Sequence, residues 1–269
     1  MTLPIDLVLV RHGQSEGNKA KRRSEQGDHS AFTMEFRERH TSTHRLTALG
    51  RQQAEQAGHW LRAEFFKASV GFDRYLVSEY VRAMETAGLL ALPGATWFAD
   101  YNLSERDWGI DSLPEDERQQ AFQDALVRRD REPFFWAPAN GESFARLCGR
   151  LRAPLDTLHR ECSDKRVLMV CHGGVMWGFR VLIERMSQAR FRELYLSKAS
   201  EDQVWNCQVI HYTRRDPESG RLSKYAGWMR MVRPHESPIW TTGWQRIERP
   251  RYSNEDLLAL AQRVPPMVE

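Results

Sequence analysis

The chain has 269 residues, of which 41% are hydrophobic, and its 39 basic and 36 acidic side chains leave a net charge of +3. A hydrophobic fraction of this size excludes a disordered chain, and the near balance of charge argues against a dedicated nucleic-acid-binding protein. Its 4 cysteines form neither a Cys-x-x-Cys pair nor a zinc-binding spacing, which favours reduced thiols and a cytoplasmic location. The first residues do not read as a signal peptide, and the most apolar stretch, 167–179, is too short and too polar to cross a membrane.

The first half of the chain alternates short apolar runs with longer amphipathic segments. A β-branched run typical of a buried parallel strand comes first, and apolar residues recur at helical spacing further along. In chain order we expect a strand at 5–10, a charged loop at 15–45 with a helical piece at 32–39, a helix at 47–66, a strand at 72–77, a helix at 79–90 and a strand at 96–98.

The second half continues this alternation. We expect a helix at 142–162 that is kinked or broken at Pro154, because proline lacks the N–H that an inner helical position needs. The other expected elements are a helix at 114–131, a loop at 133–140, a strand at 167–171, a helix at 174–186, strands at 204–213 and 225–233, and a capped helix at 253–264. Strands alternating with helices predict an α/β fold, a three-layer sandwich with a mainly parallel central sheet flanked by helices. We expect one domain over 1–269, with an insertion near 19–45 and a C-terminal extension near 234–269.

Two histidine-glycine pairs come directly after predicted strands. The first belongs to the run Arg11-His12-Gly13, and the second begins at His172. Because ligands bind beyond the carboxyl ends of parallel strands, we expect both histidines at one crevice. A histidine can act as nucleophile, acid or base, and the fork of Arg11 suits phosphate oxygens. The helix after His172 would also point free N–H groups at a bound anion. Either pair alone is more often structural, but the repeated context favours a site.

Two further segments supply a cation and a carboxylate. Ser78 and Arg82 follow the second strand and lie on the same face of the helix that starts there. Glu105 lies in the loop 103–109 between bulky apolar residues, where a carboxyl group can serve as a general acid. Asp100 and Asp107 are close enough in sequence to compete for that role.

Six short motifs in this order resemble the histidine phosphatase superfamily, in its phosphoglycerate mutase-like branch. The resemblance covers most of the chain, from residue 5 to residue 212. The motifs are Arg-His-Gly-x-Ser-x-x-Asn at 11–18, Leu-Thr-x-x-Gly-x-x-Gln-Ala at 46–54, Ser-x-x-x-Arg-Ala-x-x-Thr-Ala at 78–87, the glutamate loop at 103–109, Gly-Glu-Ser at 141–143 and His-Gly-Gly at 172–174.

The resemblance implies a phosphoglycerate mutase-like fold and a role for each matching residue. His12 matches the nucleophile that becomes phosphorylated, and Glu105 matches the group that protonates the leaving group and then activates water. The residues that match the phosphate pocket are Arg11, Asn18, Arg82 and His172. The resemblance implies no cofactor and no metal ion, and the expected partner is a small anionic phosphorylated substrate.

Three activities remain open on this basis. The first is a phosphatase that hydrolyses a phosphomonoester, and the second is a mutase that returns the phosphoryl group to its substrate. The chain lacks the long basic insertion before Gly141 that is associated with mutases, which favours hydrolysis. The third is an inactive module that binds phosphorylated ligands, and the complete set of histidines and arginines argues against it. The basic run at 19–23 is either a solvated loop or a cover over the pocket. The tail after Arg233 either packs back or contacts another subunit, and the oligomeric state stays open.

Overall fold

One mixed sheet organises the chain in the computed structural model, which describes residues 2–67, 71–109 and 113–268. The strand order is β3-β2-β4-β1-β5-β6-β7, and β8 pairs with β6. The pairs among β3, β2, β4 and β1 are parallel, and those among the later strands and with β1 are antiparallel. The strands are β1 Asp6–Arg11, β2 Arg74–Val77, β3 Trp97–Ala99, β4 Arg166–Cys171, β5 Val209–Thr213, β6 Trp228–Arg233, β7 Trp240–Thr241 and β8 Gln245–Arg246.

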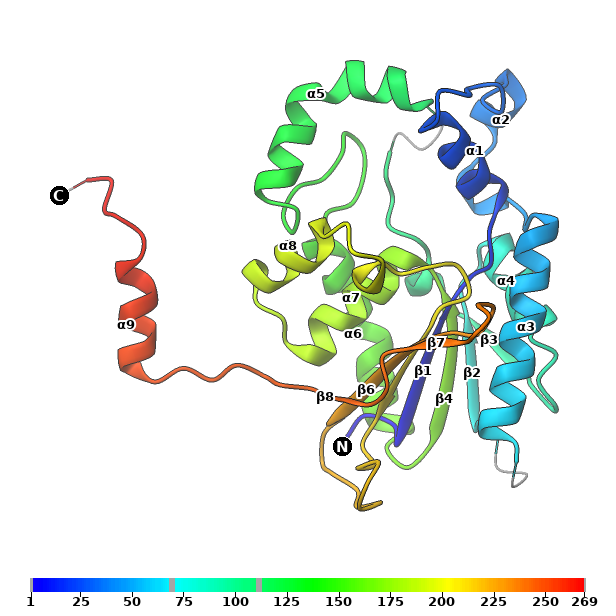
Figure 1. The fold of residues 1–269 in the computed structure, drawn as a ribbon, viewed down its shortest axis with the longest axis vertical. Helices are drawn as coiled ribbons and strands as arrows, with labels where there is room; N and C mark the ends of the chain where they lie inside the picture. The colour runs from blue at the N-terminus through cyan, green and yellow to red at the C-terminus, as the bar shows by residue number, and fades with distance from the viewer. Residues whose placement is uncertain (1, 68–70, 110–112, 269) are drawn as a thin grey trace.

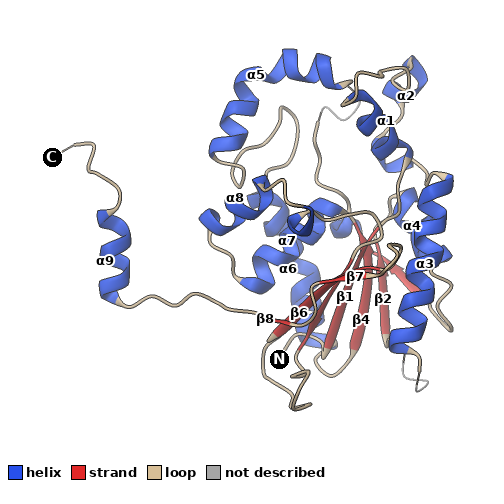
Figure 2. Ribbon diagram, in the orientation of Figure 1, coloured by secondary structure: helices blue, strands red, loops and turns tan. Residues whose placement is uncertain are grey.

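Helices cover both faces of this sheet, as Figures 1 and 2 show. The residues of a strand point alternately to opposite faces, so Leu7 and Leu9 pack with α6 and α7, whereas Val8 and Val10 pack with α3 and α4. The expected three-layer α/β fold with a parallel core is confirmed. The helices are α1 Glu16–Ser24, α2 Met34–Glu38, η1 Thr41–Thr43, α3 Ala48–Phe65, α4 Val81–Leu89, η2 Tyr101–Leu103, α5 Glu115–Arg131, α6 Phe144–Glu161, α7 Gly173–Glu184, α8 Gln188–Leu196, η3 Ser200–Asp202 and α9 Asn254–Gln262.

The predicted loop at 15–45 was wrong in its first part, because α1 forms there. Ser15 caps this helix: its Oγ accepts from the backbone N–H of Asn18, and its own N–H donates to Asn18 Oδ1. Only Ala20 and Ser24 of the helix are buried, so no apolar periodicity marks it in the sequence. The helical piece expected at 32–39 is confirmed by α2.

The predicted break at Pro154 was also wrong, since α6 continues through it without interruption. Leucines before and after the proline, among them Leu151 and Leu155, are buried in the same hydrophobic cluster. This packing on both sides outweighs the loss of one backbone hydrogen bond. Strand β5 is shorter than predicted and starts at Val209, because Cys207 before it has a left-handed backbone (φ 52°).

The C-terminal extension packs back on the domain in its first part, where β7 and β8 pair with β6 and Trp240 and Ile247 contact the core, but not in its last part. No residue from 250 to 268 is buried, and α9 stands apart from the body in Figure 1. The capped helix predicted at 253–264 is confirmed, and its cap is a capping box between Ser253 and Asp256. No helix of the described residues is both long enough and apolar enough to cross a membrane.

Candidate active site

The sheet brings the two histidines together at the carboxyl ends of two neighbouring strands. In the parallel pair of β1 and β4, Arg11 lies opposite Cys171. The next residue on each strand is therefore a histidine, and the rings of His12 and His172 lie with their centroids 5.0 Å apart. Both side chains are buried. The crevice predicted from the repeated strand-histidine-glycine pattern is present.

Hydrogen bonds fix which nitrogen of His12 faces the site. His12 Nδ1 lies 2.7 Å from the carbonyl oxygen of Gly13, so Nδ1 carries the proton and donates it. Nε2 then holds the lone pair and accepts from Arg82 Nε at 3.2 Å. Burial, followed by the charges of Arg82 and Arg11, holds the pKa of His12 well below its usual value. The imidazole is therefore neutral, with a nucleophilic Nε2.

Gly13 is required by close packing against the start of α3. A Cβ atom on Gly13 would lie 2.3 Å from the carbonyl oxygen of Gly50, and one on Gly50 would lie 2.1 Å from that of Gln14. Each glycine therefore lets the other segment approach. The N–H of Gly13 donates to Thr86 Oγ1 at 3.1 Å, which ties this turn to α4.

Two arginines place positive charge beside His12. Arg82 is buried, and its Nη1 donates to the carbonyl oxygen of Thr41 at 2.6 Å. Arg11 donates from Nη1 to the carbonyl oxygen of Val204 at 2.5 Å. Its Nε is buried and has no hydrogen-bond partner among the described residues. A buried N–H without a partner is costly unless an acceptor meets it, so this atom suits an anion.

His172 and Ser78 form the neighbouring part of the site. His172 Nε2 lies 2.8 Å from Ser78 Oγ, at the end of β2. Burial and the charge of Arg82 hold the pKa of His172 well below its usual value, so this imidazole is also neutral. Its Nδ1 is buried and has no partner among the residues described.

Two asparagines connect α1 to the end of β1. Asn18 Oδ1 accepts from the Ser15 N–H at 3.2 Å and from Asn206 Nδ2 at 3.0 Å. Asn206 Nδ2 also donates to the carbonyl oxygen of His12 at 3.1 Å. Because the oxygen of Asn18 is used in this way, its amide nitrogen is the group available to an anion. Asn206 was not among the predicted site residues, since it lies 188 positions from Asn18 and belongs to no motif.

Glu105, in the loop 103–109, places its carboxyl group against the start of α7. Its Oε1 accepts from the N–H of Arg106 at 2.8 Å and from that of Gly174 at 3.1 Å. The N-terminus of α7, which was predicted to meet the bound anion itself, thus binds this carboxylate. The two other candidates for the general acid make local contacts with the backbone instead. Asp107 accepts from the Gly109 N–H, and Asp100 caps η2.

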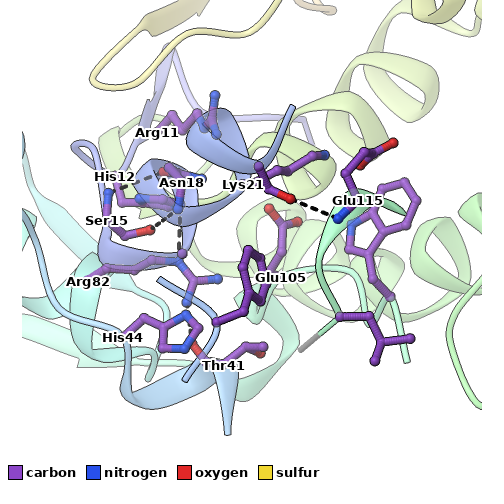
Figure 3. A pocket seen from close by; sticks show the side chains of 15 residues that line it. Arg11, His12, Ser15, Asn18, Lys21, Thr41, His44, Arg82, Glu105 and Glu115 are labelled. Carbon is purple, nitrogen blue, oxygen red and sulfur yellow. Dashed lines mark hydrogen bonds between the residues drawn. The ribbon is translucent and has the colours of Figure 1, made fainter. Parts of the chain in front are cut away.

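Of the predicted site residues, Arg11, His12, Asn18, Arg82 and Glu105 line a cavity of about 170 Å³, and His172 lies beside His12 without lining it (Figure 3). Arg11, His12, Ser15 and Asn18 lie on one side, and Glu105 and Glu115 lie on the other. The residues that line it are Arg11, His12, Ser15, Gly17, Asn18, Lys21, Ser24, Phe32, Thr41, His44, Arg82, Glu105, Trp108, Leu113 and Glu115.

A cap of α1, α2 and α5 forms the outer wall of the cavity, beyond the strand ends (Figure 1). The N–H of Glu115 donates to Ser24 Oγ at 2.8 Å, and Arg37 pairs with Glu117 at 2.6 Å. Of the basic run at 19–23, Lys21 lines the cavity, while Arg23 pairs with Asp28 at 2.5 Å. The run is thus helical, and one of its cations faces the site.

His44 is a cavity residue that belongs to no motif. Burial and the charge of Arg82 lower its pKa to about 4, so it is neutral near pH 7. Its ring stacks on Phe36 with centroids 4.8 Å apart. A Cβ atom on Gly17 would lie 2.7 Å from its Nδ1. Nothing in the sequence around His44 or Glu115 distinguishes them, because only the folding of the cap brings them here.

The described residues include no group of three or more His, Cys, Asp or Glu side chains that could hold a metal ion. Beside the strand ends, the chemistry available is that of the neutral imidazoles of His12 and His172, the guanidinium groups of Arg11 and Arg82, and the carboxyl group of Glu105. Fixed positive donors around a nucleophile are what the transfer of a charged phosphoryl group requires.

Comparison with known proteins agrees with this geometry. The family model for the histidine phosphatase superfamily (branch 1) matches residues 7–213. A 2,3-bisphosphoglycerate-dependent phosphoglycerate mutase of Methylorubrum populi is 30% identical over 198 residues, 71% of this chain and 84% of the relative. A protein of the same name from Azorhizobium caulinodans is 30% identical over 188 residues, 67% of this chain and 82% of its own.

Solved structures with the same fold are more distant in sequence. A mycobacterial glucosyl-3-phosphoglycerate phosphatase has a TM-score of 0.60 at 23% identity, covering 82% of this chain and 98% of that one. A putative alpha-ribazole-5'-P phosphatase from Escherichia coli has a TM-score of 0.59 at 19% identity, and the match covers 83% of this chain and 96% of that one. At these identities the structures support the fold.

Proposed function

The chain belongs to the histidine phosphatase superfamily, branch 1, and from this premise we propose that it is a phosphatase for a small phosphomonoester. The observation that carries the proposal is the state of His12. Its proton is fixed on Nδ1 by the Gly13 carbonyl, and its Nε2 lies among the guanidinium groups of the site. A neutral imidazole held in this way is ready to attack phosphorus without first losing a proton.

The phosphoryl group would lie between His12 and the positive donors. Arg82 would turn from Nε2 toward the phosphoryl oxygens, and the buried Nε of Arg11 would meet another oxygen. Asn18 and His172 would supply further contacts through the amide nitrogen and a ring N–H. These donors face charge that grows on the equatorial oxygens in the transition state.

The reaction would proceed in two steps that share one carboxyl group. First, His12 Nε2 bonds to phosphorus, the bond to the leaving oxygen breaks, and Glu105 gives its proton to that oxygen. Its Oε1 is held by two N–H groups, so Oε2 is the atom that carries the proton. Next, Glu105 takes a proton from water, the water oxygen bonds to phosphorus, and the P–N bond breaks. Inorganic phosphate leaves, and the starting form of His12 is restored.

Trapping the phosphorylated enzyme tests the proposal. Rapid acid-free quenching after mixing with p-nitrophenyl phosphate should give an acid-labile phosphohistidine on the peptide that contains His12. His12→Gln should lose both this label and at least about a thousandfold of hydrolysis. The matched control is His59→Gln, which changes an exposed histidine on α3. Hydrolysis by the His12→Gln protein at the unchanged rate would refute the assignment.

A mutase is the second candidate, because the relatives at 30% identity carry that name. The cap argues for hydrolysis. The first turn of α5 carries Glu115, Asp116 and Glu117, and Glu115 lines the cavity. The carboxylate of Glu115 at this wall disfavours a substrate whose own carboxylate must be retained between two transfers. Interconversion of 2- and 3-phosphoglycerate with negligible hydrolysis would decide for the mutase.

A further inference from the structure

The loop that carries Glu105 is held by a side chain from another element. Arg150 of α6 donates to the carbonyl oxygens of Asn102 and Ser104, the latter at 2.8 Å. Its Nη2 also reaches the carbonyl oxygen of Glu105 at 3.4 Å. One guanidinium therefore binds the backbone carbonyls of two residues just before Glu105 and that of Glu105 itself.

Arg150 is fixed in turn by Glu142, from the Gly-Glu-Ser motif. The two form a double hydrogen bond, Nε to Oε1 at 2.8 Å and Nη2 to Oε2 at 2.9 Å. Both side chains are mostly buried, with 22% and 16% of their surfaces exposed. The N–H of Glu142 also donates to the carbonyl oxygen of Asp107 at 2.8 Å. Glu142 thus holds the loop beyond Glu105, and Arg150 holds it before.

The position of the Glu105 carboxyl group depends on this hold. Its Oε1 lies against the start of α7, where a Cβ atom on Gly174 would come within 2.6 Å of it. A displacement of the loop by about 1 Å would break its bond to the Gly174 N–H, and misplacement on that scale can cost about a hundredfold in rate. Arg106, the next residue, is buried between the rings of Trp108, Trp136 and Phe144 and resists rotation of the loop.

We infer that Arg150 and Glu142 are positioning residues for the proton donor: their ion pair sets where the carboxyl group of Glu105 meets the leaving oxygen. The inference rests on the proposed function of Glu105. It gives the Gly-Glu-Ser motif a role in the reaction beyond capping α6 through Ser143. A purely structural pair would stabilise the fold without favouring one kind of substrate.

Leaving groups distinguish the two roles. An alkyl phosphate releases an alkoxide that needs the proton, whereas p-nitrophenyl phosphate releases a stable anion that needs it little. Arg150→Met should lower kcat/KM for glycerol 1-phosphate about tenfold more than for p-nitrophenyl phosphate. Arg152→Met, an exposed arginine two positions along the same helix, should change neither.

A double variant makes the test strict. If Arg150 acts through Glu105, then Arg150→Met should lose little further activity in a Glu105→Gln protein. Glu142→Gln keeps the shape of the side chain and should reproduce the selective loss if Arg150→Met does not fold. An equal loss for both substrates, or losses that multiply in the double variant, would overturn the inference.

Failure of the proposed function has a separate signature. Glu105→Gln alone should lower the alkyl phosphate rate about a hundredfold more than the aryl rate. If Glu105→Gln shows no such preference, the acid role itself is wrong. If it does and Arg150→Met does not, only the positioning role fails.

Discussion

Stability should fall steeply between pH 7.5 and pH 5.5 because the site buries neutral histidines. The pKa values of His12 and His172 are held well below 6.5, and that of His44 is lowered to about 4. Below pH 6.5 the unfolded chain therefore binds more protons than the folded one, so the free energy of unfolding decreases as the pH falls. For an imidazole that stays neutral at pH 5.5, the loss is about 1.4 kcal/mol.

The three together should remove about 4 kcal/mol over this range, which is a large part of a typical domain's stability. Urea unfolding at the two pH values measures it. Burial lowers the pKa values of His211 and His235 as well, so these two histidines add to the loss of stability in the same direction. Asp6, whose pKa is lowered from 3.8, stays ionised over this range and adds nothing to the loss. His12→Gln should reduce the pH dependence by about 1.4 kcal/mol, whereas His59→Gln should leave it as it is. An unchanged slope in the His12→Gln protein would refute the buried neutral state.

Three further outcomes follow from the packing. Gly50→Ala should lower the free energy of unfolding in urea by about 2 kcal/mol, because its Cβ would lie 2.1 Å from the Gln14 carbonyl oxygen. Gly149→Ala, with nothing within 4 Å of its Cβ, should instead stabilise α6 by about 1 kcal/mol. A Gly50→Ala protein as stable as the Gly149→Ala protein would refute the close packing at Gly50. Leu151→Ala should lower the unfolding free energy by about 3 kcal/mol, since this side chain is fully buried, and a loss below about 1 kcal/mol would mean that the cavity collapses. Ser78→Ala should lower kcat for p-nitrophenyl phosphate about tenfold by releasing His172, and full activity would show that Ser78 does not orient the ring.

The residues after the strands could be predicted because backbone topology alone places them. A buried strand followed by His-Gly fixes the end of that strand, and two parallel neighbours put His12 and His172 together whatever their surroundings. Arg82 could be predicted in the same way, because it lies in the first turn of the helix that follows β2. These positions need only the order of elements and the alternation of apolar residues, and both are local properties of the sequence.

The helices expected at 32–39 and 114–131 form, but their packing as a cap over the cavity could not be predicted, because it depends on contacts between distant polar residues. The bond between Ser24 and Glu115 spans 91 positions, and both elements are too polar to show an apolar face. The two bonds of Asn206 to α1 and β1 are of the same kind. Polar contacts of this type leave no periodic signal, because many pairings of similar residues are equally acceptable in the unfolded chain.

The strand-end residues carry the chemistry of the site, whereas the cap carries its selectivity. The strand ends supply the nucleophile and the positive donors that any phosphomonoester needs, and these are the residues that match the family. The cap supplies Lys21, Phe32 and Glu115, which line the cavity and match no motif, and Glu115 lies across the cavity from His12 in Figure 3. Differential binding of the leaving group must come from this wall, since the phosphoryl subsite is the same for every substrate. Changes in the cap should therefore alter which phosphomonoester is preferred, while changes at His12 should abolish turnover of all of them.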